Sequence, residues 1–282
     1  MTNKLALTDL LNRTTLEVSD PAEISMDRLA DVLNEYSFAM IRGVIDGEVI
    51  LEAKRRLAER YNPDNDSPAM GEHPKDIMGN FQKLSIGGAE HSGVYRPRCM
   101  RTYYNPIWAD DIYGLRESFR KCAQIRNIMY GFDVNFAIDT VEDGFWTAAR
   151  IHSYPAGGGF LVSHLDDVVP VVQRAEGLSR YFQPVIVMSR KGTDPDCDFE
   201  TGGGFFELNS HRYYYEEACE LGDVVIYSGA TQHGVADIDL HRTFDSRRPE
   251  GRYSVFVTLY KEFTRRHELA DYVPPPENQT AI

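Results

Sequence analysis

The chain has 282 residues, of which 42 % are hydrophobic, enough for the core of one large domain or two small ones. Its formal net charge of −13 at pH 7 argues against a general nucleic-acid binder, which needs a basic surface. Its four cysteines lie far apart with no Cys-x-x-Cys spacing, which excludes the common zinc-ribbon and thioredoxin motifs and predicts reduced thiols in a cytosolic protein.

The first part of the chain, residues 1–145, is predicted to be mostly helical. Apolar residues recur every three or four positions in three segments, and a short apolar run closed by a glycine predicts a strand at Ser37–Arg42. Asn62–Val94 is rich in Gly, Pro and Asn, and we expect long loops there that could cover an active site. The three predicted helices are Asp27–Tyr36, Asp46–Arg60 and Asp110–Tyr130.

After residue 145 the pattern changes to short apolar strands separated by turns that are rich in glycine. Eight such strands indicate a mainly β fold, a sandwich or a barrel with flanking helices. They are predicted at Thr147–Tyr154, Phe160–His164, Phe182–Arg190, Gly203–Leu208, Arg212–Tyr215, Val224–Ser228, His233–Ile238 and Arg252–Tyr260.

The two parts are predicted to form one domain over residues 1–282. No Pro- or Ser-rich linker separates them, and the strands of 146–262 need the helices to cover their apolar outer face. The tail, 270–282, is polar and rich in proline, so we expect it to be disordered. The first 15 residues lack the apolar run of a signal peptide, and no run of 18 apolar residues predicts a membrane span, so we expect a cytoplasmic location.

Two histidines and an aspartate have the spacing of a metal site. His164 and Asp166 are two residues apart on a predicted strand, so both side chains point to the same side. His233 follows another short strand and can be presented beside them. Two imidazoles and one carboxylate are the ligands of non-haem Fe(II) oxygenases, which keep open positions for co-substrate and oxygen. The pattern therefore favours an enzyme that uses O2.

Arg252 and Ser254 have the same i, i+2 relationship on the last predicted strand. With Phe256 and Thr258 they would line an interior, while the intervening residues pack outward. A buried guanidinium needs an anionic partner. We therefore expect Arg252 to bind the far carboxylate of a dicarboxylic co-substrate.

Taken in order, three fragments resemble the Fe(II)/2-oxoglutarate-dependent oxygenases of the small-molecule hydroxylase type. RIHSYPAGGGFLVSHLDD, at 150–167, is similar to the first two core strands of that family and leads into His-x-Asp. GDVVIYSGATQHGV is similar to the segment that carries its second iron histidine, and GRYSVFV to the strand that carries its 2-oxoglutarate arginine. The resemblance covers roughly 146–262.

This resemblance implies a double-stranded β-helix (jelly-roll) core. Fe(II) would be held by His164, Asp166 and His233, which would also be the catalytic residues. 2-Oxoglutarate would pair with Arg252. Ser254 and Tyr154 would donate hydrogen bonds to it. O2 and 2-oxoglutarate would be converted to succinate and CO2 as a C–H bond of the substrate is oxidised. Because Asp166 is present, hydroxylation, desaturation or ring closure is favoured over halogenation.

The second histidine ligand has two candidates. Many members of the family place it about ten residues before the arginine, whereas His233 lies 19 residues before Arg252 and His241 lies 11 before it. His233 is favoured because it follows one strand and a turn and begins another strand-like segment, whereas the surroundings of His241 are typical of an exposed loop. On this interpretation residues 240–250 form a lengthened hairpin loop.

The substrate is expected to be a small molecule such as an amino acid or a biosynthetic intermediate, with no nucleic acid or membrane as partner. Arg150, Tyr103 and Trp108 are candidates to contact it. Two other functions stay open: a cupin-like metal dioxygenase or isomerase without 2-oxoglutarate, and a non-catalytic jelly-roll binding protein. The identity of the substrate and the oligomeric state are not predicted by any motif.

Overall fold

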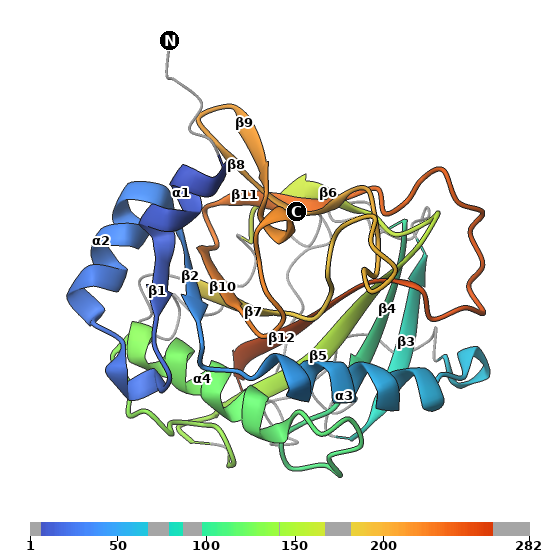
Figure 1. The fold of residues 1–282 in the computed structure, drawn as a ribbon. Helices are drawn as coiled ribbons and strands as arrows, with labels where there is room; N and C mark the ends of the chain where they lie inside the picture. The colour runs from blue at the N-terminus through green and yellow to red at the C-terminus, as the bar shows by residue number, and fades with distance from the viewer. Residues whose placement is uncertain (1–6, 67–78, 87–97, 141, 167–181, 262–282) are drawn as a thin grey trace, which may run out of the picture.

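Two β-sheets dominate the computed structural model, which describes residues 7–66, 79–86, 98–140, 142–166 and 182–261 (Figure 1). The larger sheet has eight strands in the order β1-β2-β10-β7-β12-β5-β4-β3, and the smaller has four in the order β6-β11-β8-β9. The strands of the large sheet are β1 Thr15–Glu17, β2 Phe38–Arg42, β3 Phe81–Ile86, β4 Cys99–Tyr104, β5 Phe145–Pro155, β7 Phe182–Val187, β10 Val224–Ser228 and β12 Gly251–Lys261. Those of the small sheet are β6 Leu161–His164, β8 Gly203–Leu208, β9 His211–Tyr214 and β11 Gln232–Ala236.

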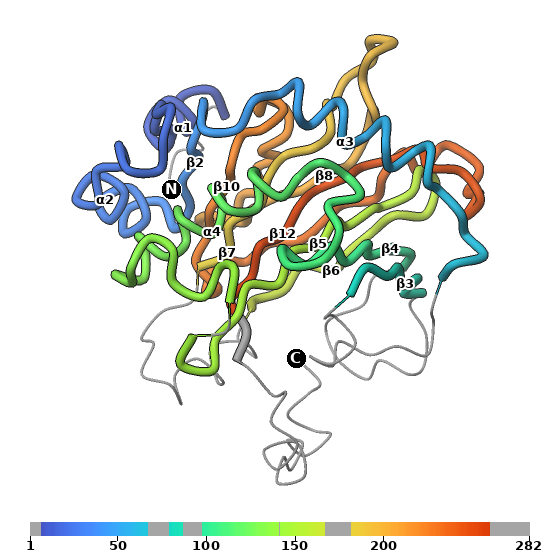
Figure 2. Tube along the Cα trace, turned by 90° about the horizontal axis from the view of Figure 1, so that it is seen from below, coloured from blue at the N-terminus to red at the C-terminus, as the bar shows by residue number. Residues whose placement is uncertain are grey.

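Four α-helices accompany the sheets in the described residues, and α3 (Gly47–Glu59) and α4 (Arg116–Tyr130) lie along the outer face of the large sheet (Figure 2). Local signals set their ends: the Ser25 hydroxyl caps α2, the Asp46 carboxylate caps α3, and Gly131 ends α4 in the left-handed region at φ 71°. None of these helices is long and apolar enough to span a membrane. They are α1 Leu7–Thr14, α2 Met26–Tyr36, α3 Gly47–Glu59 and α4 Arg116–Tyr130, with short 3₁₀ turns η1 Pro21–Glu23, η2 Pro63–Asn65 and η4 Tyr215–Glu217.

Apolar residues gather in two main layers, one on each face of the large sheet. On the outer face, Ile50 of α3 and Phe119 of α4 belong to a core that also contains Val255 and Val257 of β12. On the inner face, Val185 and other large-sheet residues share a core with residues of the small sheet. The strands can serve both layers because successive side chains of a strand point to opposite faces. The inner-face core consists of Leu10, Leu11, Phe38, Met40, Val185, Val187, Phe206, Tyr213, Tyr215, Val225 and Tyr227.

Part of the inner face is polar rather than apolar. Strands β5 and β12 pair antiparallel over their whole length, so that Tyr154 stands opposite Arg252 and His152 opposite Ser254. These four residues are buried, at 8 % exposure or less. A polar stripe inside a protein needs internal partners or a ligand, because burying unpaired polar groups is unfavourable.

The prediction of a mainly β chain with flanking helices is confirmed, and the β1–β2 pairing, which is parallel, makes the large sheet mixed. The eight predicted strands all exist, with ends shifted by a few residues at most. The closure of the two sheets into a double-stranded β-helix stays a prediction. The predicted disorder of 270–282 falls outside the described residues.

The described part of residues 1–145 contains strands as well as helices. Strands β1, β3 and β4 lie there and were not predicted, and β3 falls inside the segment Asn62–Val94 that was expected to be loop. The last predicted helix begins at Arg116 rather than Asp110, and in the segment before it the Asp111 carboxylate accepts hydrogen bonds from the amides of Leu115 and Arg116 at 3.0 and 3.3 Å.

Candidate active site

His164, Asp166 and His233 converge between the ends of two neighbouring strands. His164 ends β6 and stands opposite His233 of β11 in the antiparallel register, with ring centroids 4.3 Å apart. Asp166 lies just beyond β6, and its amide donates to the carbonyl of Gly229 at 2.9 Å. One ligand atom from each residue lies within 4.8 Å of the other two, and all three residues are buried. This triad is the arrangement that the spacing of the sequence predicts.

Backbone hydrogen bonds orient both imidazoles of the triad. Nδ1 of His164 lies 2.7 Å from the carbonyl oxygen of Val162, and Nδ1 of His233 lies 2.8 Å from that of Thr231. A carbonyl oxygen can only accept, so each Nδ1 carries a proton and the lone pair available to a metal is on Nε2. Each Nε2 lies 3.6 Å from an oxygen of Asp166. Two lone pairs and a carboxylate that face one another form a site for a cation.

The protonation state of His233 suits metal binding. Burial lowers its pKa to about 4, although the nearby negative charge of Asp166 acts in the opposite direction. The ring is therefore neutral at pH 7 and can donate its lone pair. His241, the other candidate, has an exposed side chain 3.9 Å from Glu200 and takes no part in the triad.

Arg252 lies deep on the polar stripe, and three of its nitrogens are engaged. Nε donates to Glu216 at 2.6 Å, Nη2 to the hydroxyl of Tyr215 at 2.8 Å, and Nη1 to the hydroxyl of Ser254 at 3.1 Å. Its guanidinium carbon lies 5.3 Å from the ring centroid of Tyr154. The predicted pair of Arg252 and Ser254 is thus brought together with Tyr154.

Two buried polar atoms of the stripe have no hydrogen-bond partner among the described residues. One is the hydroxyl of Tyr154, and the other is Nδ1 of His152. Nε2 of His152 accepts from Nε of Arg150 at 3.1 Å, so Nδ1 must carry the proton. Burial raises the pKa of Tyr154 to about 12 and holds that of His152 well below its usual value, so both groups are neutral donors at pH 7. Such donors call for a ligand with acceptor oxygens.

The three residues predicted to contact the substrate lie in different places. Arg150 is buried on the inner face of β5, two residues from His152, and its Nη1 donates to the hydroxyl of Thr258 at 3.1 Å. Trp108 packs on Trp146 near the opposite end of that strand, with ring centroids 5.4 Å apart. Tyr103 stands opposite Ile151 and belongs to the helix-covered core, so the structure does not bring it to the triad.

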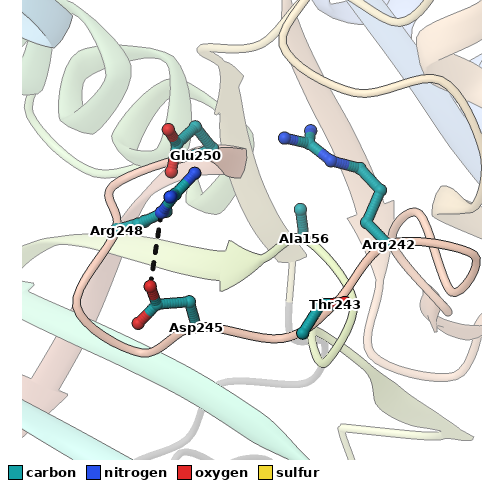
Figure 3. A pocket seen from close by; sticks show the side chains of 6 residues that line it. All are labelled: Ala156, Arg242, Thr243, Asp245, Arg248 and Glu250. Carbon is teal, nitrogen blue, oxygen red and sulfur yellow. Dashed lines mark ion pairs between the residues drawn. The ribbon is translucent and has the colours of Figure 1, made fainter.

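A separate surface pocket is formed by the long connection between β11 and β12 (Figure 3). Its two arginines are exposed and have acidic neighbours: Arg242 lies 3.6 Å from Asp239, and Arg248 lies 3.3 Å from Asp245. The connection is long, but β11 belongs to the small sheet and β12 to the large one, so the two strands do not pair and the prediction of a hairpin loop over 240–250 is wrong. The pocket is lined by Ala156, Arg242, Thr243, Asp245, Arg248 and Glu250.

Glu216 is the functional candidate that the sequence pattern missed. It lies in η4, directly after β9, and no spacing relates it to Arg252, 36 residues further on. The signal that could have pointed to it is physical: a buried arginine requires a counter-charge, and an acidic residue within an otherwise buried aromatic segment is a candidate to supply it.

Comparisons with known proteins give similarity in structure only. No family profile and no curated protein matches the sequence. Many solved structures are similar to this chain, and three of them illustrate the range. A prolyl-4-hydroxylase from Pseudomonas putida is 14 % identical with a TM-score of 0.47, over 84 % of this chain and 99 % of that one. An oxidoreductase of the 2OG-Fe(II) oxygenase family from Burkholderia pseudomallei is 14 % identical with a TM-score of 0.47, over 89 % of this chain and 99 % of that one.

The third structure is a prolyl hydroxylase from Trichoplax adhaerens in complex with a peptide fragment of hypoxia inducible factor. It is 12 % identical to this chain with a TM-score of 0.51, over 88 % of this chain and 93 % of that one. At this identity the similarity concerns the course of the backbone and not the residues that act. The chain therefore has the overall fold of the Trichoplax prolyl hydroxylase.

Proposed function

We propose that the chain is an Fe(II)- and 2-oxoglutarate-dependent oxygenase. The reaction would convert 2-oxoglutarate, O2 and a substrate C–H bond to succinate, CO2 and a C–OH group. The observation that carries this proposal is the convergence of His164, Asp166 and His233, with both Nε2 atoms directed at the carboxylate. We also propose that the two sheets form the double-stranded β-helix core in which such triads are held.

The triad fits Fe(II) by its chemistry. Three protein ligands leave the remaining positions of an octahedral ion open, as a metal that binds both a co-substrate and oxygen requires. Iron bound there would supply the site at which O2 is activated and the co-substrate loses CO2. The backbone bonds to Nδ1 of each histidine hold the two rings for this task.

The polar stripe fits a dicarboxylic co-substrate. Arg252 would pair with its distal carboxylate, and Ser254 and Tyr154 would donate hydrogen bonds. The unpartnered hydroxyl of Tyr154 supports this role, since a bound carboxylate would satisfy it. Tyr154 also stands directly opposite Arg252 on the paired strands, where a ligand bound to the arginine would be within its reach. A cupin-like enzyme without 2-oxoglutarate would have no use for these donors.

For the substrate we propose a small molecule rather than a macromolecule. The charge of −13 disfavours nucleic acid as the substrate. Arg150, on the same strand face as Tyr154, is our candidate to contact an anionic group of that molecule. Succinate release in the presence of single amino acids, compared with proline-containing peptides, separates the small-molecule proposal from the peptide activity of the Trichoplax structure.

An anaerobic titration with Fe(II) and 2-oxoglutarate tests the class of enzyme. Their joint binding produces a weak visible charge-transfer band. We expect this band in the wild type and in His241→Ala, and its loss in His233→Ala and Arg252→Ala. His241→Ala is the matched control, because it removes an exposed imidazole that is not part of the triad.

Each result of this titration has a definite meaning. If the band is lost in His241→Ala and kept in His233→Ala, the assignment of the second histidine ligand is overturned but the class of enzyme is kept. Absence of the band in folded wild-type protein would overturn the 2-oxoglutarate proposal. In that case a metal enzyme without this co-substrate, or a binding protein, would be the better interpretation.

A further inference from the structure

Arg252 and Glu216 form an ion pair that is closed off from solvent. Both side chains are 1 % exposed, and Nε of Arg252 lies 2.6 Å from Oε1 of Glu216. Burial alone would lower the pKa of Arg252, but the charge of Glu216, with Tyr215 and Tyr154, outweighs burial and raises that pKa above its usual value. The arginine proposed to receive the co-substrate is therefore charged and already has a carboxylate partner.

Glu216 is held in place by backbone as well as by Arg252. Its second oxygen, Oε2, accepts the amide of Gly204 on β8 at 2.7 Å. A Cβ at Gly203, where φ is +108°, would lie 2.7 Å from the same oxygen, so a side chain there would displace the carboxylate. Glu216 thus lies in a fitted cradle and cannot swing away from Arg252 without losing a buried hydrogen bond.

The guanidinium nevertheless keeps donors for a ligand. Arginine has five N–H groups, and the three hydrogen bonds to Glu216, Tyr215 and Ser254 use three of them. A further carboxylate can therefore bind to Arg252, but it must do so close to the fixed negative charge of Glu216. Two like charges that share one cation inside a protein repel each other.

We propose that Glu216 is a permanent counter-ion of Arg252 that competes with the distal carboxylate of the co-substrate and thereby sets how tightly the co-substrate binds. This inference rests on the proposed function, because it takes 2-oxoglutarate as the incoming anion. It makes Glu216 a positioning residue that acts through Arg252. In the ligand-free protein Glu216 neutralises the buried cation, and in the complex it weakens the ligand's hold.

Removal of the charge of Glu216 should therefore have two opposite effects. Glu216→Gln keeps the shape of the side chain but leaves Arg252 uncompensated, so the ligand-free protein should melt at a lower temperature than the wild type. The same variant should bind 2-oxoglutarate more tightly, with a Kd lower by roughly tenfold, because the ligand becomes the only counter-ion. A merely structural role for Glu216 would lower stability without any gain in affinity.

The experiment measures melting temperature and 2-oxoglutarate affinity anaerobically with Fe(II) in the wild type and in Glu216→Gln. The control Asp66→Asn removes a carboxylate from another buried arginine, Arg101, whose Nη2 lies 2.7 Å from Asp66. Arg101 stands opposite Ser153, on the other face of β5 from Tyr154, so this control should lose stability with no change in affinity. A second probe, 2-oxobutanoate, lacks the distal carboxylate, so its Kd should be the same for Glu216→Gln and the wild type.

A lower Kd for 2-oxoglutarate in Glu216→Gln, with no gain for 2-oxobutanoate, supports the proposal. Equal or weaker binding in that variant, with normal binding to the wild type, overturns it and leaves the proposed function intact. No binding to either protein overturns both. If Glu216→Gln does not fold, the double variant Glu216→Gln/Arg252→Gln decides: a folded double variant supports the counter-ion role, and an unfolded one overturns it.

Discussion

Tyr154 and Arg252 stand directly opposite each other on paired strands, with the tyrosine ring 5.3 Å from the guanidinium carbon. The ring therefore stabilises the cation from one side, while Glu216 balances its charge through Nε. The phenol hydroxyl takes part in neither contact and has no partner among the described residues. One residue thus combines a structural contact, made by its ring, with a donor that the described residues leave unpaired.

Tyr154→Phe should separate these two contributions. The variant keeps the ring contact and removes a buried, unsatisfied hydroxyl, so its free energy of unfolding should equal or exceed that of the wild type. Its affinity for 2-oxoglutarate should fall by roughly tenfold, the worth of one hydrogen bond to a charged group. Denaturant unfolding and the anaerobic titration measure the two effects. A variant that loses stability but binds normally would show that the hydroxyl has a partner within the protein.

Addition of Mn(II), an oxygen-stable probe, should stabilise the protein against heat through the triad. At a hundredfold excess over Kd we expect about 2.7 kcal/mol. Asp166→Asn should abolish this increase. Asp196→Asn should keep it, although Asp196 belongs to a second group of possible ligands with Asp194 and Cys197, because that group's two carboxylates are exposed. If thermal melts show that Asp196→Asn loses the stabilisation by Mn(II) and Asp166→Asn keeps it, the metal binds at this second group instead.

Stability of the metal-free protein should depend on pH through His233. Its pKa of about 4 in the folded protein lies below the ordinary value of 6.5, so between these values the unfolded chain binds more protons than the folded one. The contribution is complete above pH 6.5 and is lost as the pH falls toward 4, by about 3 kcal/mol in total. Unfolding curves for the wild type and His233→Gln across this range measure the difference, and parallel curves would contradict it.

Gly204→Ala should displace Tyr215, whose hydroxyl helps to hold the guanidinium of Arg252 in place. A Cβ at this position would lie 2.1 Å from the hydroxyl oxygen of Tyr215, which accepts from Nη2 of Arg252. We expect a loss of about 1–3 kcal/mol in unfolding free energy, as for other overpacked sites, together with weaker binding of 2-oxoglutarate. Gly79→Ala is the control, because its Cβ would meet nothing within 4 Å. A stable variant with unchanged binding would show that the tyrosine can move at little cost.

The elements that sequence analysis places well are those whose signals are local. Gly203–Leu208 and Val224–Ser228 are predicted to the residue, because turns bound both apolar runs. The i, i+2 spacing of His164 and Asp166 is also local, and in the structure the two side chains lie together as the spacing predicts. By contrast, β3 is a half-buried edge strand with weak alternation, and only its pairing with β4 makes it a strand.

The rest of the site depends on contacts between distant segments. The partnership of Glu216 with Arg252 requires the 3₁₀ turn after β9 to meet the inner face of β12, which no periodicity encodes. The position of Tyr103 is missed for the same reason: whether a strand residue faces the triad or the helices is decided by register, and a shift of one residue reverses it.

The order of strands in the large sheet has a consequence for how the chain is made. β12, the last strand in the described residues, lies in the middle of the sheet between β7 and β5. The ribosome therefore releases β5 and β7 long before β12, which joins them. Until β12 is made, the edges of β5 and β7 that will pair with it stay unpaired. Arg252 arrives with β12, so its contacts with Tyr154 and Glu216 can form only after β5 and the turn after β9 have long left the ribosome.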